Sequence, residues 1–311
     1  MAKIEDIHIG HWTDLEVATG LTVFMLPPEA VVAAQPRGQN PGTLNVEIFG
    51  PTGSADHAAA IVLTGGSVLG LAAAAHLAIV LEQRNAAPGP FAVPMVTGAV
   101  VFDLHIGRRA WPPTDAVENA LDAAVAAGQE ALGCVGAGTG TMTGPIYGAS
   151  STTKGGFGRA TATTAQGVSV AAWAVVNCVG SVMGKDGSIL AGLRRDGVFV
   201  SVTEALAADP DIVFGAGRAT TLVVVATDAK IDKRSTWRLA QAGHSGIAHA
   251  ITPCATGGDG DTTFAVSTGD VPVRNMLTVE AVACEVTAEA IRAAILAATP
   301  LHGVPSATSL H

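Results

Sequence analysis

The chain of 311 residues is 49% apolar and only 14% charged, so it can bury a large core and must also cover apolar surface, part of it between subunits. Its net charge is −9, and its basic residues form pairs such as Arg108-Arg109 and Arg194-Arg195 rather than longer clusters. Because a phosphate backbone is bound by clustered Lys and Arg side chains, we expect no nucleic acid partner.

The sequence shows no segment for membrane insertion or secretion. No apolar run reaches membrane-spanning length without a polar break, and the first residues, MAKIEDIHIGHW, lack the basic-then-apolar layout of a signal peptide. The four cysteines are far apart and form no CxxC pair, which is typical of reduced thiols in a cytoplasm rather than of disulfides or a zinc site. We therefore expect a cytoplasmic protein without membrane contact.

Short apolar runs alternate with Ala-rich segments along the chain and predict strands and helices. The expected elements are a hairpin of 20–26 and 30–35, a strand over 59–63, a helix over 68–84 capped by Ser67, strands over 91–96 and 98–104, a helix over 114–132, strands within 167–183, a strand over 222–226, a helix over 232–251 capped by Asp232, a strand over 261–268 and a helix over 278–298. No linker or repeat interrupts this pattern, so 1–311 is predicted as one domain. Strands followed by helices, twice over, favour stacked sheets with helices outside, and a doubly wound parallel sheet is the competing architecture.

Several common site motifs are missing from the sequence. The Gly-rich stretch at 136–140 has threonine at 141, where a GxGxxG fingerprint requires glycine, so we expect no nucleotide cofactor. His244 and His249 are five positions apart and leave one helix face, and HExxH does not occur, so we expect no metal. No GxSxG elbow is present, and Ser67 in GGSVLG fits a helix cap better than a nucleophile.

Five polar residues stand out, and each also has an ordinary structural interpretation. Lys154 lies inside the uncharged stretch STTKGGFG, but it can be a plain surface lysine. Asn177 interrupts an apolar strand, where a turn or bulge would also explain it. Asp259 and Asp261 form a DGD triplet, which is commonly a turn and can also aim two carboxylates at one site. Thr220 lies two residues before the strand over 222–226, and because threonine is a good strand former, the strand can simply start early.

Taken jointly and in this order, these residues and their flanking motifs resemble the L-aminopeptidase/D-esterase family of N-terminal-nucleophile hydrolases, which includes β-aminopeptidases and nylon-oligomer (6-aminohexanoate-oligomer) endohydrolases. The resemblance covers nearly the whole chain. It rests on IGHWTD (9–14), LTGGSVLGL (63–71), VTGAVVFDL (96–104), GAGTG (136–140), KGGFG (154–158), AVVNCVG (174–180), TTLVVVATDA (220–229) and DGDTTFAVSTG (259–269). The family implies an α/β (α+β) fold, a four-layer αββα sandwich, without cofactor or metal, assembled as a homo-oligomer of four or more copies.

The resemblance also implies a self-cleavage. Thr220 matches the family's nucleophile, which becomes a chain terminus when the precursor cuts itself. The cut would fall between Ala219 and Thr220 and give a larger chain, 1–219, and a smaller one, 220–311. Relatives usually carry asparagine before the nucleophile, but an acyl shift uses the peptide carbonyl, which alanine also provides.

The other site residues are assigned by the same resemblance. Lys154 and Asn177 match polar residues that face the nucleophile, and Asp259 and Asp261 match the acidic pair of the nylon-oligomer branch. An ammonium at Lys154 would keep a neighbouring amine neutral by like-charge repulsion, and the Asn177 amide can donate to a tetrahedral oxyanion. The two aspartates can orient the amine and the hydroxyl, or bind a cationic substrate end.

An N-terminal threonine is a chemically reasonable nucleophile. A hydroxyl is weak without a base, and a free α-amine, with a pKa of about 7.7–8.0, can take its proton, whereas a peptide nitrogen cannot. The sequence therefore predicts hydrolysis of linear amides, such as nylon oligomers, through an acyl-enzyme on Thr220. The alternatives are an aminopeptidase for β-, D- or small L-residues and an uncut relative that binds small amides without catalysis.

Overall fold

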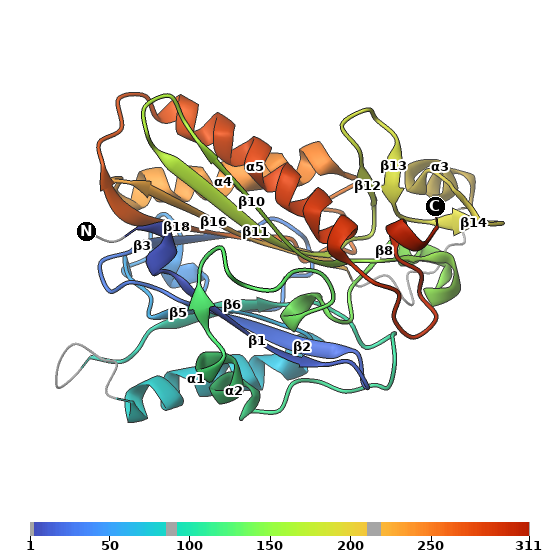
Figure 1. The fold of residues 1–311 in the computed structure, drawn as a ribbon, viewed down its shortest axis with the longest axis horizontal. Coiled ribbons are helices and arrows are strands. Elements are labelled where there is room, and N and C mark those ends of the chain that lie inside the picture. The colour runs from blue at the N-terminus through green and yellow to red at the C-terminus, as the bar shows by residue number, and fades with distance from the viewer. Residues whose placement is uncertain (1–2, 85–91, 210–218, 311) are drawn as a thin grey trace.

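The protein forms four layers, in which two sheets pack face to face and helices cover both outer faces (Figure 1). The computed structural model describes residues 3–84, 92–209 and 219–310. Most neighbouring strands are antiparallel, and the two parallel pairs within the two large sheets are β5 with β6 and β16 with β18. The αββα sandwich is therefore confirmed, and the doubly wound parallel sheet is wrong.

The first sheet carries helices α1 (Leu71–Gln83) and α2 (Ala116–Asp122) on its outer face. A single 3-10 turn, Ser67–Gly70, leads into α1. The strands of this sheet, in spatial order, are β4 (Thr43–Leu44), β6 (Val96–Val100), β5 (Ala60–Thr64), β2 (Thr19–Met25), β1 (His8–Asp14) and β7 (Val125–Ala126).

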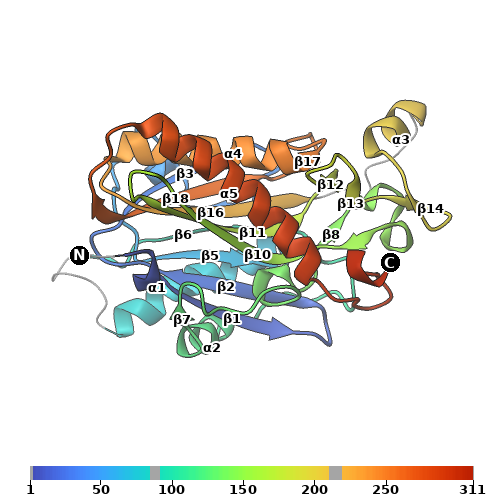
Figure 2. The ribbon, with the colours of Figure 1, turned by 45° about the horizontal axis from the view of Figure 1, so that its top comes forward.

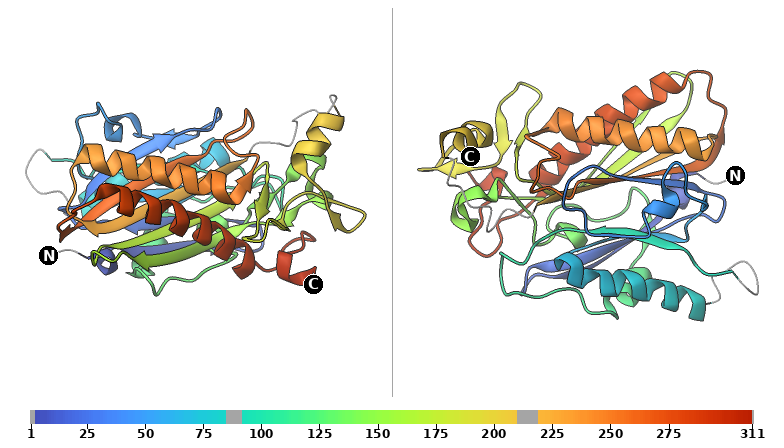
Figure 3. Two further views of the ribbon diagram at one scale, coloured as in Figure 1. Left: turned by 90° about the horizontal axis from the view of Figure 1, so that it is seen from above. Right: turned by 180° about the vertical axis from the view of Figure 1, so that it is seen from behind.

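The second sheet is covered by helices α4 (Lys233–Ala250) and α5 (Met276–Ala297), which lie side by side on it (Figure 3). Its strands, in spatial order, are β10 (Gly156–Thr163), β11 (Ser169–Asn177), β16 (Thr220–Ala229), β18 (Thr262–Val271) and β3 (Val31–Pro36). Gly158 lets α5 approach β10 closely, because a Cβ there would lie 2.2 Å from the backbone nitrogen of Ala294.

Smaller elements gather at one end of the sandwich (Figure 2). They are β12 (Ser181–Met183), β13 (Ile189–Ala191), β14 (Arg194–Arg195), β15 (Val198–Phe199) and α3 (Val202–Ala208), with β8 (Met142–Thr143), β9 (Thr153–Lys154) and β17 (Ile251–Thr252) beside them. Further 3-10 turns are Ile4–Asp6, Glu47–Phe49, Gly136–Gly138, Pro145–Tyr147, Ala149–Ser151 and Ala307–Ser309.

The apolar run of β16 is continuous because both faces of the second sheet are buried. Val223 and Val225 pack against the helices, whereas Leu222 and Val224 pack between the two sheets. Because side chains alternate along a strand, Thr220 shares the inner face with Leu222 and Val224. The strand thus places its first residue at the rim of the space between the sheets.

Three expectations about local structure are wrong. The segments 20–26 and 30–35 form no hairpin: β2 and β3 lie in different sheets, and the chain crosses between layers after Pro27-Pro28, which supply no amide donors. The helix expected over 114–132 ends at Asp122, because 125–126 pair with β1 and Gly128 turns the chain at φ 103°. The strands expected over 91–96 and 98–104 are replaced by β6 alone, with residue 91 outside the described range.

The two expected helix caps have different outcomes. Asp232 caps α4 and accepts a hydrogen bond from the Ser235 amide at 2.8 Å. Ser67 caps no helix: it is the first residue of the 3-10 turn, its hydroxyl makes no capping bond, and its φ is 54°. Among the described helices, none combines the length and the apolar character needed to cross a bilayer.

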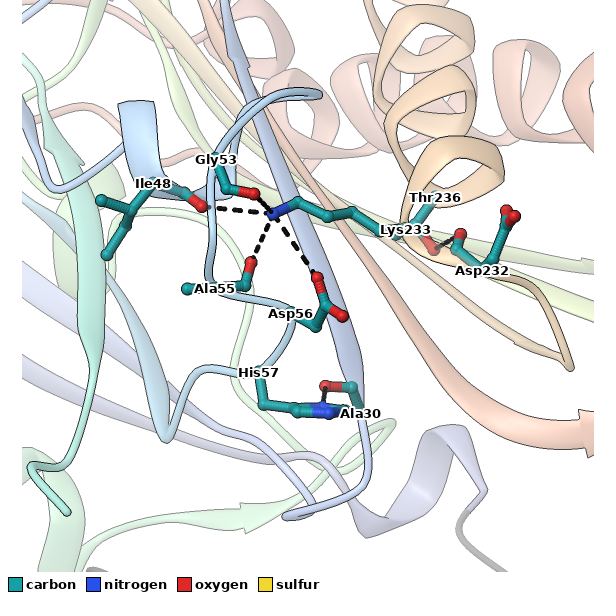
Figure 4. Close-up of polar contacts among 9 residues, drawn as sticks. All are labelled: Ala30, Ile48, Gly53, Ala55, Asp56, His57, Asp232, Lys233 and Thr236. Atoms are coloured by element: carbon teal, nitrogen blue, oxygen red, sulfur yellow. Dashed lines mark hydrogen bonds and ion pairs between the residues drawn. The ribbon is translucent and has the colours of Figure 1, made fainter.

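Lys233 links α4 to the loop before β5 through hydrogen bonds of its side chain (Figure 4). Its ammonium donates to the carbonyls of Ile48, Gly53 and Ala55 at 3.3, 2.5 and 2.7 Å and lies 3.5 Å from the Asp56 carboxylate. The side chain is 14% exposed, so the carbonyls replace most of its hydration. The contact joins a helix of the second sheet to a loop of the first.

We expect Lys233→Met to destabilise the protein by about 2 kcal/mol, because it leaves the carbonyls with fewer partners. In thermal unfolding, the midpoint should fall by about 4 °C. Lys230→Met is the matched control, since Lys230 is an exposed lysine three positions earlier. Equal midpoints for the two variants would contradict the structural role of the Lys233 contact.

Candidate active site

Thr220 and Asn177 lie opposite each other at the ends of neighbouring strands. Thr220 begins β16, Asn177 ends β11, and the two are paired in the antiparallel register. Both are nearly fully buried, at 5% and 3% exposure. The Asn177 side chain accepts from the Met142 amide at 2.9 Å and donates to the Phe102 carbonyl at 3.2 Å, so its amide group is held in one orientation. The strand end thus explains why a polar residue interrupts the apolar run.

The peptide bond between Ala219 and Thr220 is held in place by the segment that contains the DGD triplet. The Ala219 amide donates to the Gly258 carbonyl at 3.0 Å, and the Gly260 amide donates to the Ala219 carbonyl at 2.8 Å. The Thr220 hydroxyl donates to the same carbonyl oxygen at 2.6 Å. Residues 210–218, which precede this bond, lie outside the described range. Two donors therefore converge on one carbonyl oxygen.

Gly260 occupies a position that admits no side chain. A Cβ at this residue would lie 2.8 Å from the Thr220 hydroxyl oxygen and 2.6 Å from the Asn40 carbonyl oxygen. Both contacts are closer than packed carbon atoms tolerate, and the Asn40 carbonyl is backbone. Glycine is therefore required if the Gly260 amide is to reach the Ala219 carbonyl.

Asp261 is a buried carboxylate beside the nucleophile strand. It accepts hydrogen bonds from the Thr221 amide at 2.7 Å and the Ala255 amide at 2.9 Å. Burial first, and the neighbouring Asp259 second, raise the pKa of Asp261 to about 7 against the lowering effect of those bonds. At neutral pH this carboxyl group is therefore poised to gain or lose a proton.

Asp259 is held in the same way on the other side of Gly260. Its carboxylate accepts from the Val179 amide at 3.2 Å and from the amide and hydroxyl of Thr256 at 2.9 and 2.6 Å. Burial raises the pKa of Asp259 as well. Neither aspartate hydrogen-bonds to Thr220 in the described structure, so both act on the loop and on the backbone around the threonine.

Lys154 is fully buried, and the surface interpretation of this residue is wrong. Its ammonium donates to the carbonyls of Thr139 and Thr141 at 2.8 and 2.6 Å. Burial lowers the pKa of Lys154 to about 8, and Cys134 and Asp103 oppose that shift. The lysine pairs with β8 at Met142, whose amide also contacts the site asparagine. Lys154 and Asn177 are thereby brought into one cluster.

Asp103 belongs to this cluster and was not singled out from the sequence. It accepts from the Thr19 hydroxyl and the Gly66 amide, both at 2.7 Å, and burial raises its pKa to about 6. The signal was present as an acidic residue inside the apolar run GAVVFDL. A carboxylate is costly to bury without partners, so such a position indicates a polar site.

A cavity of about 380 Å³ opens onto Thr220 between the two sheets. Its walls come from the loop after β3, from the turn before α1 and from the end of β6. The lining residues are Gln39, Asn40, Pro41, Gly42, Ser67, Val68, Val100, Phe102, Ala219 and Thr220. A linear amide could reach the threonine through this opening.

The histidines considered as metal ligands are apart from this site. His244 is buried in α4, its ring bonds the Gln35 carbonyl at 2.7 Å, and burial lowers its pKa to about 4. His249 is exposed and lies 3.6 Å from Glu285. In the parts of the chain that the structure describes, no group of three or more His, Cys, Asp or Glu side chains is placed to hold a metal ion.

Comparison with protein families places the chain among peptidases. The model of the family described as "Peptidase family S58" matches residues 1–309. An uncharacterized aminopeptidase of Mycobacterium tuberculosis is 34% identical over 98% of this chain and 96% of its own length. The corresponding protein of Mycobacterium leprae is 35% identical over 98% of this chain and 92% of its own length. A 6-aminohexanoate-oligomer endohydrolase of a Kocuria species is 30% identical over 82% of this chain and 71% of its own length.

Two solved structures share the fold at lower sequence identity. A β-aminopeptidase of a Burkholderia species superposes with a TM-score of 0.74 at 23% identity, covering 99% of this chain and 91% of that one. The L-aminopeptidase D-Ala-esterase/amidase of Ochrobactrum anthropi, described as a variant of the Ntn-hydrolase fold, gives 0.73 at 21% identity, covering 96% and 87%. The sandwich is thus the fold of these hydrolases.

The raised pKa of Asp261 predicts a pH-dependent stability. The folded state binds this proton more tightly than the unfolded chain, whose aspartates titrate near 3.8. The stability that the fold gains by binding this proton is complete below about pH 4 and is lost as the pH rises through about 7. We therefore expect Asp261→Asn, which removes the titration, to gain thermal stability relative to the unmodified protein between about pH 4.5 and pH 8.

The control for this measurement is Asp196→Asn at an exposed turn with φ 52°, a conformation that asparagine tolerates. Its unfolding midpoint should follow that of the unmodified protein across the same pH range. Parallel curves for Asp261→Asn and the unmodified protein would show that this carboxyl keeps an ordinary pKa in the fold.

Proposed function

Because the chain belongs to peptidase family S58, we propose that it is an amide hydrolase whose nucleophile, Thr220, is released as a chain terminus by self-cleavage after Ala219. Hydrolase activity itself follows from the family and its aminopeptidase and endohydrolase relatives. The observation that carries the proposal is the Ala219 carbonyl, which receives both the Thr220 hydroxyl and the Gly260 amide.

Self-cleavage proceeds as an N-to-O acyl shift. The Thr220 hydroxyl oxygen adds to the Ala219 carbonyl carbon, and the oxyanion that forms is stabilised by the Gly260 amide. The carbon–nitrogen bond then breaks, the nitrogen takes up the hydroxyl proton, and the acyl group is left as an ester on Thr220. Water hydrolyses this ester to a carboxylic acid at Ala219 and restores the hydroxyl, now beside a free amine.

The mature site then repeats the chemistry on a substrate amide. The Thr220 amine accepts the proton of its own hydroxyl as the oxygen attacks, and the protonated amine passes that proton to the departing substrate nitrogen. The Lys154 ammonium disfavours a second cation nearby, and this keeps the amine neutral. Asn177, oriented by two hydrogen bonds, is the side-chain donor to the substrate oxyanion.

The two aspartates support the strand and the loop that meet at the cut. Asp261 holds the backbone amide immediately after Thr220, and Asp259 anchors the loop to Val179, two residues beyond the site asparagine. Both therefore position the nucleophile rather than contact it before cleavage. After cleavage, the new amine at Thr220 lies one residue before the backbone amide that Asp261 holds.

For the substrate, we propose internal amide bonds of linear oligomers such as 6-aminohexanoate oligomers, the substrate named for the relative that is 30% identical. The described lining of the cavity at Thr220 contains no acidic side chain that would hold an N-terminal ammonium. The second candidate is an aminopeptidase, which is favoured by the names of the relatives that are 34% and 35% identical.

Thr220→Ala should abolish both self-cleavage and hydrolysis, because it removes the attacking oxygen. Self-cleavage is measured as the intact mass under denaturing conditions. The chain has 31.1 kDa over 311 residues, which is about 100 Da per residue, so the cut gives pieces of about 22 and about 9 kDa. Thr263→Ala is the matched control, since Thr263 lies in the neighbouring strand β18 and its buried hydroxyl has no hydrogen-bond partner in the described structure. Hydrolysis that survives in Thr220→Ala would remove Thr220 from the mechanism.

An N-acetylated 6-aminohexanoate oligomer should be cut at internal bonds at a rate close to that of the uncapped oligomer. The blocked amine has no acidic partner to lose in the described cavity. Separation of the products by chromatography identifies the bond that is cut. If acetylation lowered the rate of hydrolysis by more than about 100-fold, the protein would be an obligate aminopeptidase instead. In that case the capped substrate would leave unpaired a buried charged side chain that normally binds the free amine.

A further inference from the structure

A second cavity continues the opening at Thr220. It has a volume of about 460 Å³ and shares three wall residues with the first cavity, Ser67, Val68 and Phe102. The two cavities therefore form one elongated cleft, which starts at Thr220 and is extended by Leu69, Leu104, His105 and Arg109. We call this extension the distal arm.

Most of the residues that line the distal arm are apolar. Val68 and Leu69 are 62% and 37% exposed, and Phe102 and Leu104 add further apolar surface. Exposed apolar side chains that line a cavity bind apolar ligand groups, because contact with the ligand removes them from water. A chain of methylene groups matches this wall.

Arg109 provides the charge of the distal arm. It is the one lysine, arginine or acidic side chain among the described residues that line either cavity. The guanidinium is exposed and forms no ion pair or hydrogen bond with another described residue. Arginine stays charged and binds carboxylates through paired N–H groups, so an arginine without a described partner in a mainly apolar cleft favours a carboxylate ligand.

Ser67 stands where the two cavities meet. Its backbone is left-handed at φ 54°, a strained conformation for a serine, and its side chain caps no helix. Its hydroxyl hydrogen-bonds to no other described residue, which leaves it available to a ligand in the cleft. A contact between Ser67 and the substrate would explain both its strained backbone and its available hydroxyl.

We propose that the distal arm binds the carboxylate end of a linear aliphatic amide, with the methylene chain along Val68 and Phe102 and the carboxylate on Arg109. The inference rests on the proposed function in one respect: the amide to be cut lies at Thr220. It adds that substrates are recognised by their acid end, so a free carboxylate, rather than a free amine, decides how well an oligomer binds.

The first test measures binding without chemistry. Hexanoate and the uncharged hexan-1-ol are titrated by NMR into the purified protein, into Arg109→Gln and into Arg108→Gln. Arg108 is the matched control, because it is the neighbouring exposed arginine and lines neither cavity. We expect Arg109→Gln to weaken hexanoate roughly fivefold, the scale of one exposed ion pair, and to leave hexan-1-ol unchanged. Arg108→Gln should change neither ligand.

The second test uses the reaction. For a 6-aminohexanoate oligomer, Arg109→Gln should raise KM and leave kcat unchanged, and the same oligomer with its acid end converted to an amide should show no such change. Equal binding of the two titration ligands, no binding of hexanoate, or equal losses in both arginine variants overturns the proposal. Absence of hydrolysis with the hexanoate result intact would instead contradict the proposed function and leave the carboxylate subsite standing.

Discussion

The site depends on the backbone hydrogen bonds that Ala219 makes with Gly258 and Gly260. Two backbone hydrogen bonds hold this residue beside the DGD loop, and they fix the direction of the carbonyl that Thr220 contacts. They also require the loop to approach so closely that position 260 has no room for a side chain. The flanking aspartates then have a structural reason to be there, because their carboxylates bind the backbone amides that keep loop and strand together.

Around this contact the protein buries ionisable groups at the end of an apolar sandwich. Asp103 follows β6 of the first sheet, Lys154 lies in the short strand β9, and Asp259 and Asp261 precede β18 of the second sheet, all with little or no exposure. Burial moves the pKa values of Lys154 and Asp261 to about 8 and about 7, close to neutrality. Such groups change charge at small energetic cost near neutral pH, and this property is typical of active sites and rare in structural cores.

The sequence predicted the sandwich and the family because ordered motifs along nearly the whole chain carried the signal. Periodicity found the long helices and β16, but not how the strands pair. The hairpin across Pro27-Pro28 failed because two consecutive strands can enter different sheets, and the helix over 114–132 failed because Gly128 and pairing with β1 override alanine propensity. Asp103 leaves a signal in the sequence, as an acidic residue inside an apolar run, but its partners Thr19 and Gly66 are distant along the chain and only the fold shows them. Arg109 leaves no such signal, because the cavity that it lines exists only in the fold.

The position of β16 has a consequence for how such a molecule can be made. A cut before Thr220 would leave β16, β18, α4 and α5 in one piece, and β3, β10 and β11, which flank those strands, in the other. Lys233, in the smaller piece, would then donate hydrogen bonds to carbonyls of the larger piece. The uncut chain would serve as its own assembly template, since both halves of the sheet are tethered while it forms. Once cut and unfolded, the two pieces would have to find each other by diffusion, so the working enzyme would persist through slow unfolding rather than through refolding.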